Sequence, residues 1–158
     1  MLTFWLLIIA IIVTLIHSYV KKSWKKPKWA ETFLAYLLFF NVGIAGLLGF
    51  YAHIFMADTT AQLLGWASGS PFQYQVGMVD LAYGVLGIVA FWVRKRFWSA
   101  TVLGFVIIML GCFIGHMIQW GHGDTASYNI SWNVWVEALA VPLLLIVLHS
   151  YYTCTCKK

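Results

Sequence analysis

The chain has 158 residues, of which 62% are hydrophobic and 9% are charged. A soluble globular domain carries roughly 25% charged residues, so this composition excludes a soluble protein and predicts an integral membrane protein. We interpret the net charge of +5 as a signal of membrane topology and of contact with membrane lipids, and we expect no nucleic acid as a partner.

Apolar stretches long enough to cross a bilayer occur five times along the chain. A spanning helix needs about 20 mostly apolar residues. The strands of a membrane β-barrel would instead alternate apolar and polar residues, and that pattern is not seen in these stretches. The sequence therefore predicts an all-α, polytopic membrane helical bundle of five transmembrane helices, at residues 2–20, 31–56, 75–93, 98–119 and 131–152.

The first of these stretches predicts a retained anchor, because its lysines follow the apolar run and no small-x-small cleavage site closes it. We expect residues 1–28 to form this N-terminal transmembrane anchor helix and a basic cytoplasmic loop. Residues 29–152 are expected to form a four-helix transmembrane bundle, and residues 153–158 a short cytoplasmic tail. The tail contains Cys154 and Cys156, which could bind a soft metal, carry a lipid or have no role.

The basic residues predict the orientation of the chain. All ten fall on one side of a five-span arrangement. Short cytoplasmic loops hold the excess of lysine and arginine, so we expect a multi-pass protein of the bacterial inner membrane, with a periplasmic N-terminus and a cytoplasmic C-terminus. These residues are Lys21, Lys22, Lys25, Lys26, Lys28, Arg94, Lys95, Arg96, Lys157 and Lys158.

In this orientation, ionisable side chains from four different spans lie at one shallow depth near the outer surface. Ionisable groups within spans are costly, and they usually face the bundle interior and pair with one another. Glycines at helical spacing accompany them on the second, third and fourth spans, and such stripes mark the faces where helices approach closely. The predicted result is an outward-facing polar cavity lined by His53, Asp80, His116 and Glu137.

Two imidazoles and two carboxylates are a plausible ligand set for a divalent ion such as zinc, iron or manganese. We therefore predict that these four residues bind a metal ion or a small polar ligand, and that the protein is an accessory or carrier subunit. Gln119 and Asn133 share helix faces with them and are further ligand-binding candidates. His122 and Asp124, in the loop after the fourth span, are candidates for a second shell.

Two other interpretations remain open. The His17 and His149 side chains lie near the cytoplasmic surface, and together with His53 and His116 they give two histidine pairs at two depths. Such pairs could hold two b-type haems in a membrane electron carrier. The outer polar residues could instead only hold the helices in register, as a structural membrane subunit. No catalytic motif is evident, so catalytic residues are unassigned and an enzyme is not favoured.

The segments "GWASGSPFQYQVGMVDLAYGVLGI" and "RFWSATVLGFVIIMLGCFIGHMIQ" resemble an uncharacterised family of small bacterial integral membrane proteins. The wider layout is similar to that of DoxX-like four-helix membrane proteins, with residues 1–28 as an additional anchor. This resemblance implies that His53, Asp80 and His116 are motif positions, and it implies quinone-linked redox chemistry. It also implies a membrane protein partner, although a homo-oligomer is equally compatible with the sequence.

Overall fold

The computed structural model describes residues 2–24, 28–126, 128 and 131–156. Helices account for most of this part of the chain, and it contains no β-strand, so the prediction of an all-helical protein is confirmed. In chain order the elements are α1 (Leu2–Val20), α2 (Lys28–Leu37), η1 (Leu38–Ile44), α3 (Ala45–Phe55), α4 (Ala57–Leu64), α5 (Pro71–Ala90), α6 (Arg96–Gly121), η2 (Val134–Ala140) and α7 (Val141–Cys156).

The elements η1 and η2 are π-helical segments within longer helices. The first continues directly from α2 into α3, and the second continues directly into α7. Four helical stretches of the described chain are long and apolar enough to cross a membrane. They agree with four of the five predicted spans, and they are Leu2–Val20, Lys28–Phe55, Arg96–Gly121 and Val134–Thr155.

The remaining predicted span, residues 75–93, corresponds to α5, which is a helix but is not among these four. The reason is compositional, because Gln73, Gln75 and Asp80 interrupt the apolar character of its first half. Length and hydropathy therefore establish four membrane-capable helices. Whether α5 also crosses depends on its position beside the others.

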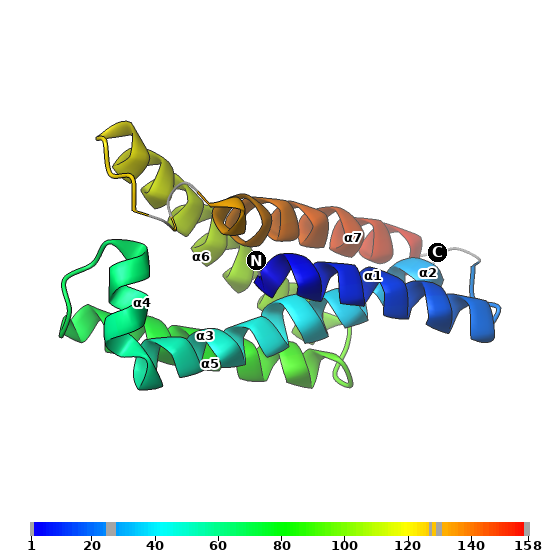
Figure 1. Ribbon diagram of the computed structural model, residues 1–158. Helices are drawn as coiled ribbons and strands as arrows, with labels where there is room; N and C mark the ends of the chain where they lie inside the picture. The colour runs from blue at the N-terminus through cyan, green and yellow to red at the C-terminus, as the bar shows by residue number, and fades with distance from the viewer. Residues whose placement is uncertain (1, 25–27, 127, 129–130, 157–158) are drawn as a thin grey trace.

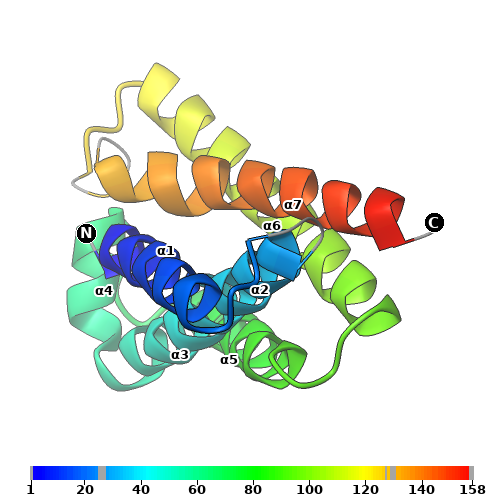
Figure 2. The same cartoon turned by 90° about the vertical axis from the view of Figure 1, so that its right-hand side faces the viewer.

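The helices form an elongated bundle (Figure 1). In this view α3 and α5 run along one side, α6 and α7 along the other, and α1 lies between the two pairs. Figure 2 shows the same arrangement from the end, with α7 above α1 and the α3–α5 pair below it. The predicted anchor helix α1 also contacts α2, η1 and η2. The division between anchor and bundle stays a prediction.

Glycines bring α5 directly against η1 and α3. A Cβ atom on Gly46 would lie 2.7 Å from the carbonyl oxygen of Asp80 and from the amide nitrogen of Gly84. A Cβ atom on Gly87 would lie 2.6 Å from the Cα of Gly43. These distances leave no room for a side chain, so the two backbones are in contact. The glycine stripes predicted on the second and third spans are therefore confirmed.

The glycine pair of the fourth predicted span behaves differently. Among the described residues nothing lies within 4 Å of a Cβ atom built on Gly111 or on Gly115. The expectation that this pair marks a closely packed face is therefore wrong. Glycine spacing shows where a helix can approach a neighbour, but here no described helix does so.

The packed core lies toward one end of the bundle. It is formed mainly by α2, the first half of α6 and α7, with Leu34, Leu38, Trp98 and Leu145 fully buried. The indole of Trp98 donates a hydrogen bond to the Ala90 carbonyl oxygen at 2.6 Å and so fixes the turn between α5 and α6. The buried residues of α6 end at Val106.

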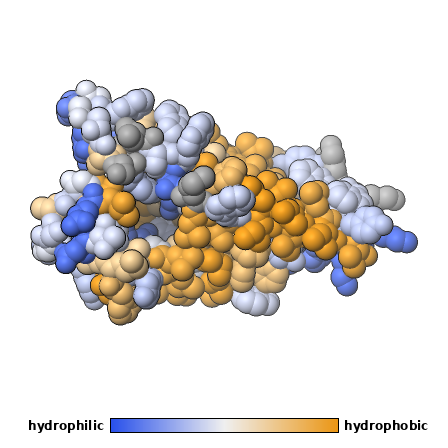
Figure 3. All heavy atoms as spheres, in the orientation of Figure 1, coloured by the Kyte–Doolittle hydropathy of each residue, from blue (hydrophilic) through white to orange (hydrophobic). Residues whose placement is uncertain are grey.

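The opposite end of the bundle is more open and more polar. In α3 no residue is fully buried, and the half of α6 beyond Val106 contains none either. Figure 3 shows apolar atoms as a band over the middle of the molecule, and hydrophilic atoms over the end that carries α4 and the C-terminal part of α6. The predicted site residues lie toward this open end.

Candidate functional site

His53 on α3 and Asp80 on α5 face each other across the glycine interface. The His53 Nε2 atom lies 3.9 Å from Asp80 Oδ2, and their side chains are 11% and 23% exposed. Gly49 makes this position possible, since a Cβ atom there would lie 2.7 Å from Asp80 Oδ2. The carboxylate therefore occupies space that any residue other than glycine at position 49 would fill.

Glu137 lies on the other side of the bundle, within η2, and forms a second polar group. Its Oε2 atom accepts a hydrogen bond from the Thr3 hydroxyl at 2.9 Å and another from the Tyr128 hydroxyl at 3.0 Å. The His116 ring packs against the Tyr128 ring, with centroids 5.2 Å apart. Tyr128 therefore stands between His116 and Glu137 as a common neighbour.

Tyr128 also shows that the two polar groups share one electrostatic environment. Its pKa is raised well above the usual 10.0, first by burial, then by the charge and the hydrogen bond of Glu137, and further by the charge of Asp80. A phenol responds to a carboxylate only when that charge is close and poorly screened by water. The carboxylates of Asp80 and Glu137, from different helices, therefore act on one hydroxyl.

The two π-helical segments meet at this network through α1. Asn41 lies in η1, is 1% exposed, and donates from Nδ2 to the Thr3 carbonyl oxygen at 2.9 Å. The hydroxyl of the same threonine donates to Glu137 in η2. Single-turn π-helical insertions occur often at functional sites. Here each segment places one polar side chain against the first turn of α1.

Residues after α3 cover the His53 side of the site. The Trp66 ring lies over the His53 ring with centroids 5.8 Å apart. The backbone amide of Tyr128 donates to the Leu63 carbonyl oxygen at 3.1 Å and so ties α4 to the loop after α6. Beneath this cover the Nδ1 atom of His53 is buried and has no hydrogen-bond partner among the described residues.

The site residues predicted from the sequence do not include Thr3, Asn41, Trp66 or Tyr128. Each is a single polar or aromatic residue in an apolar or loop segment, where such residues are common. One signal was present in α1, whose buried face carries small and hydroxyl-bearing residues at helical spacing. The buried residues of that face are Thr3, Leu6, Ala10, Thr14 and Ser18.

Three of the additional candidates lie at the end of α6 and in the loop after it. Gln119 and His122 are exposed at the end of α6. Asp124 uses its Oδ1 atom to accept the amide hydrogen of Ala126 at 2.9 Å, which closes a local turn. Asn133 is half-buried, one helical turn before Glu137, and it does have interaction partners.

The predicted metal site is not supported by the geometry. Among the described residues no three histidine, cysteine, aspartate or glutamate side chains are placed to hold one metal ion. The physical reason is that the four predicted ligands divide into two groups. His53 pairs with Asp80, while one oxygen of Glu137 is occupied by the hydroxyls of Thr3 and Tyr128.

The histidines of the alternative haem set also have partners on neighbouring helices. His17 Nδ1 lies 3.0 Å from the Tyr36 hydroxyl, and His149 Nε2 lies 3.0 Å from the Ser99 hydroxyl. His17 and His149 therefore each have one ring nitrogen within hydrogen-bonding distance of the protein. Their use as haem ligands stays a prediction.

A family model matches residues 1–157, and its description is a family of unknown function, DUF6790. This agrees with the resemblance to an uncharacterised family, and nothing found links the chain to DoxX-like proteins. No curated protein and no solved structure matches the chain.

Proposed function

We propose, for a chain that belongs to the DUF6790 family of unknown function, a five-span protein of the bacterial inner membrane that binds a small cationic ligand at its outer end. The ligand site is the set of side chains around Asp80 and Glu137, which we call the outer cleft. It consists of His53, Asp80, Glu137 and Tyr128, with His116 and Trp66 at its margins. The protein would act as a carrier or accessory subunit.

The position of α5 supports a fifth crossing. Near its beginning a Cβ atom on Gly77 would lie 3.2 Å from the Cβ of His53, close to the end of α3. Just after its end, Arg94 forms an ion pair with Glu31, close to the beginning of α2. The helix and the turn that follows it therefore run antiparallel to most of the membrane-capable stretch Lys28–Phe55.

The charges favour an outer cleft that faces the periplasm. The described basic residues in the loops after α1 and α5 lie at the end of the bundle opposite α4. The excess of lysine and arginine on the cytoplasmic side then leaves the cleft outside. In this orientation the N-terminus is periplasmic and the C-terminus is cytoplasmic.

The observation that carries the ligand proposal is the placement of two carboxylates at the open end of the bundle, Asp80 opposite His53 and Glu137 hydrogen-bonded to Tyr128. Asp80 and Glu137 both raise the pKa of Tyr128. Two like charges in a poorly screened site repel each other, and a cation between them removes that repulsion. The aromatic rings of Trp66 and Tyr128 suit an organic ammonium group, because ring faces attract cations.

The cleft is accessible, as a binding site has to be. Asp80 keeps 23% of its side-chain surface exposed, and no residue of α3, which carries His53, is fully buried. Figure 3 shows the surface hollowed between the α4 end and the C-terminal part of α6. An ammonium ion also needs fewer fixed ligands than a divalent metal ion does. Two separate carboxylates therefore suit an ammonium ion better.

Thermal unfolding of the detergent-purified full chain tests this proposal. We expect tetramethylammonium or methylammonium to raise the melting temperature, because a ligand at about 100 times its Kd stabilises the folded state by roughly 2.7 kcal/mol. Asp80→Asn and Glu137→Gln keep the side-chain shapes and remove the charges, so each should abolish the shift. Asp58→Asn, an exposed change on α4, is the matched control and should keep it.

The remaining interpretations predict other results. A shift with zinc or manganese but not with the ammonium ions would restore the divalent metal site. A purified protein with a haem absorption band would support the electron carrier and its His17, His149, His53 and His116 ligands. A flat melting temperature with every cation, together with destabilised Glu137→Gln protein, would leave a structural role for the polar groups.

A further inference from the structure

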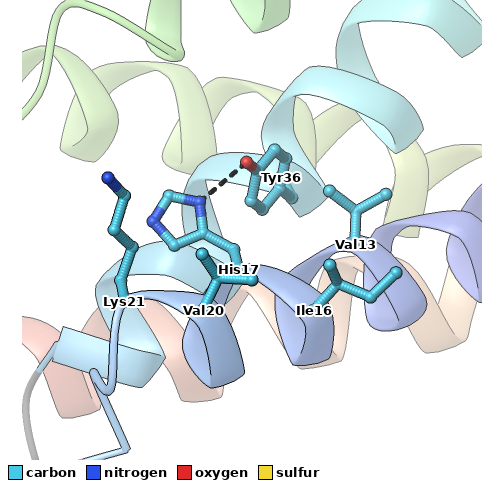
Figure 4. A pocket seen from close by; sticks show the side chains of 6 residues that line it. All are labelled: Val13, Ile16, His17, Val20, Lys21 and Tyr36. Atoms are coloured by element: carbon cyan, nitrogen blue, oxygen red, sulfur yellow. Dashed lines mark hydrogen bonds between the residues drawn. The ribbon is translucent and has the colours of Figure 1, made fainter.

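A second polar feature lies at the other end of the bundle, beside the last turn of α1 (Figure 4). It is a pocket of about 270 Å³ whose walls are mostly apolar and whose rim carries one ammonium group, one imidazole and one phenol. It is far along α1 from Thr3 and shares no residue with the outer cleft. The lining residues are Val13, Ile16, His17, Val20, Lys21 and Tyr36.

Two hydrogen-bond donors line the pocket at the end of α1, His17 in its last turn and Lys21 directly after it. His17 and Lys21 are four residues apart, so their side chains lie one above the other. The Tyr36 hydroxyl lies 3.0 Å from His17 Nδ1. When that hydroxyl donates, the ring proton of neutral His17 is on Nε2, and Figure 4 shows this second nitrogen on the side of Lys21.

The charge of Lys21 is not neutralised by the acidic residue at this end of the bundle. Glu31, in the first turn of α2, is held by Arg94 in an ion pair. Lys22 follows Lys21 in a left-handed conformation with φ of 51°, so the chain leaves the helix directly after the pocket. The pocket rim therefore carries a positive charge at the end of a membrane-capable helix.

The walls below this rim are apolar and open to the surroundings. Ile16 is 58% exposed and Val20 is 67% exposed. In a membrane-capable helix these side chains face acyl chains, whereas the rim lies at the level of the headgroups. A ligand that fits both parts has an anionic head and a hydrocarbon tail.

We propose that this pocket binds one anionic phospholipid. Its phosphate is bound between the Lys21 ammonium group and the His17 Nε2–H group, and an acyl chain runs along Val13 and Ile16. Basic pockets between transmembrane helices are known to favour anionic headgroups. Tyr36 is a positioning residue, because its hydroxyl fixes the orientation of the His17 ring. The site is independent of the outer cleft and of the cation proposed there.

Lipid retention tests the proposal. The full chain is purified in detergent, equilibrated with equal amounts of dioleoyl phosphatidylglycerol and dioleoyl phosphatidylcholine, and washed, and the retained lipids are quantified by mass spectrometry. We expect the wild type to retain phosphatidylglycerol in preference to phosphatidylcholine. Lys21→Gln should lower its retention about fivefold, as expected for one lysine at a membrane surface.

Lys22→Gln is the matched control, since it removes the same charge one residue away and outside the pocket lining. Its retention should equal that of the wild type, and Tyr36→Phe should fall between the two. Equal losses for Lys21→Gln and Lys22→Gln would overturn the proposal in favour of diffuse charge attraction. Loss of the lipid during a wash with excess inorganic phosphate would mean that the pocket recognises phosphate alone, and would overturn it as well.

Discussion

Thr3 is one hydroxyl-bearing residue in an apolar helix, and it contacts both π-helical segments. Its carbonyl oxygen accepts from Asn41, and its hydroxyl donates to Glu137. A polar side chain in hydrocarbon is costly unless it is hydrogen-bonded, so these contacts account for the presence of both polar partners. No spacing rule could predict them, because residues 3 and 137 are brought together only by the packing of α1 on η2.

Tyr128 gives the first residue-scale prediction, which concerns alkaline pH. Because the folded-state pKa of Tyr128 lies above 10.0, the folded protein holds this proton more tightly than the unfolded chain does. Its stabilising contribution is complete below the unfolded pKa and is lost as pH rises toward the folded one. The melting temperature of the wild type should therefore fall above about pH 10.

Tyr128→Phe removes the hydroxyl, so its unfolding should be less sensitive to that pH range. At neutral pH the variant should be less stable by about 1.5–3 kcal/mol, as expected for a hydrogen bond to a charged group. Circular dichroism melts of both proteins between pH 8 and pH 11 provide the measurement. Parallel pH profiles would contradict the raised pKa of the phenol.

At the scale of elements, the decisive contact is the one between α5 and the η1–α3 stretch. A Cβ atom on Gly87 would meet the backbone of Gly43 at 2.6 Å, whereas one on Gly115 would meet nothing within 4 Å among the described residues. Gly87 lies in α5 and Gly115 lies in α6, and the sequence around them predicts close packing for both. Only the path of the neighbouring helix distinguishes them.

This pair makes a controlled experiment. Gly87→Ala forces the two backbones apart, and overpacking of this kind costs about 1–3 kcal/mol. Gly115→Ala adds the same methyl group in open space, where the higher helix propensity of alanine makes the change neutral or slightly stabilising. In one detergent, the midpoint temperature of unfolding should be lower for Gly87→Ala than for Gly115→Ala. Equal midpoints would mean that α5 does not pack as described.

Considered as a whole molecule, the protein has one packed end and one open end. The fully buried residues of α6 stop at Val106, and beyond that point its C-terminal half diverges from α3 and α5 (Figure 1). The packed end has the basic loops and the lipid pocket. The open end has the carboxylates of the proposed cation site, which a ligand would reach without unfolding the core.

Topology is the prediction at this scale. A reporter enzyme that works only in the periplasm should be active when fused after Asp58 or Asp124, and inactive when fused after Arg96 or Lys158. The cause is the retention of lysine- and arginine-rich loops in the cytoplasm. Reporter activity at Arg96 would remove α5 from the list of crossings, and it would leave the four membrane-capable helices untouched.

Composition and periodicity were sufficient for the fold class and for much of the architecture. The lack of charge between residues 98 and 119 gives a membrane helix, because an unpaired charge there is costly in any fold. The stripe of Gly77, Gly84 and Gly87 predicts a helix face that allows close contact, because helical periodicity alone places the three on one face. The common depth of His53, Asp80, His116 and Glu137 is inferred from the same rise per residue, and it stays a prediction.

Tertiary structure alone decided which of these side chains meet. The depth of a side chain in the membrane depends on its position along one helix. Contact between two side chains also depends on how their two helices rotate and cross, and no local sequence pattern encodes that geometry. The four residues therefore form a His53–Asp80 pair and a Glu137 group joined to Thr3 and Tyr128, instead of one four-ligand site. The same limit explains Gly111 and Gly115, since the divergence of α6 leaves them open where their spacing predicts contact.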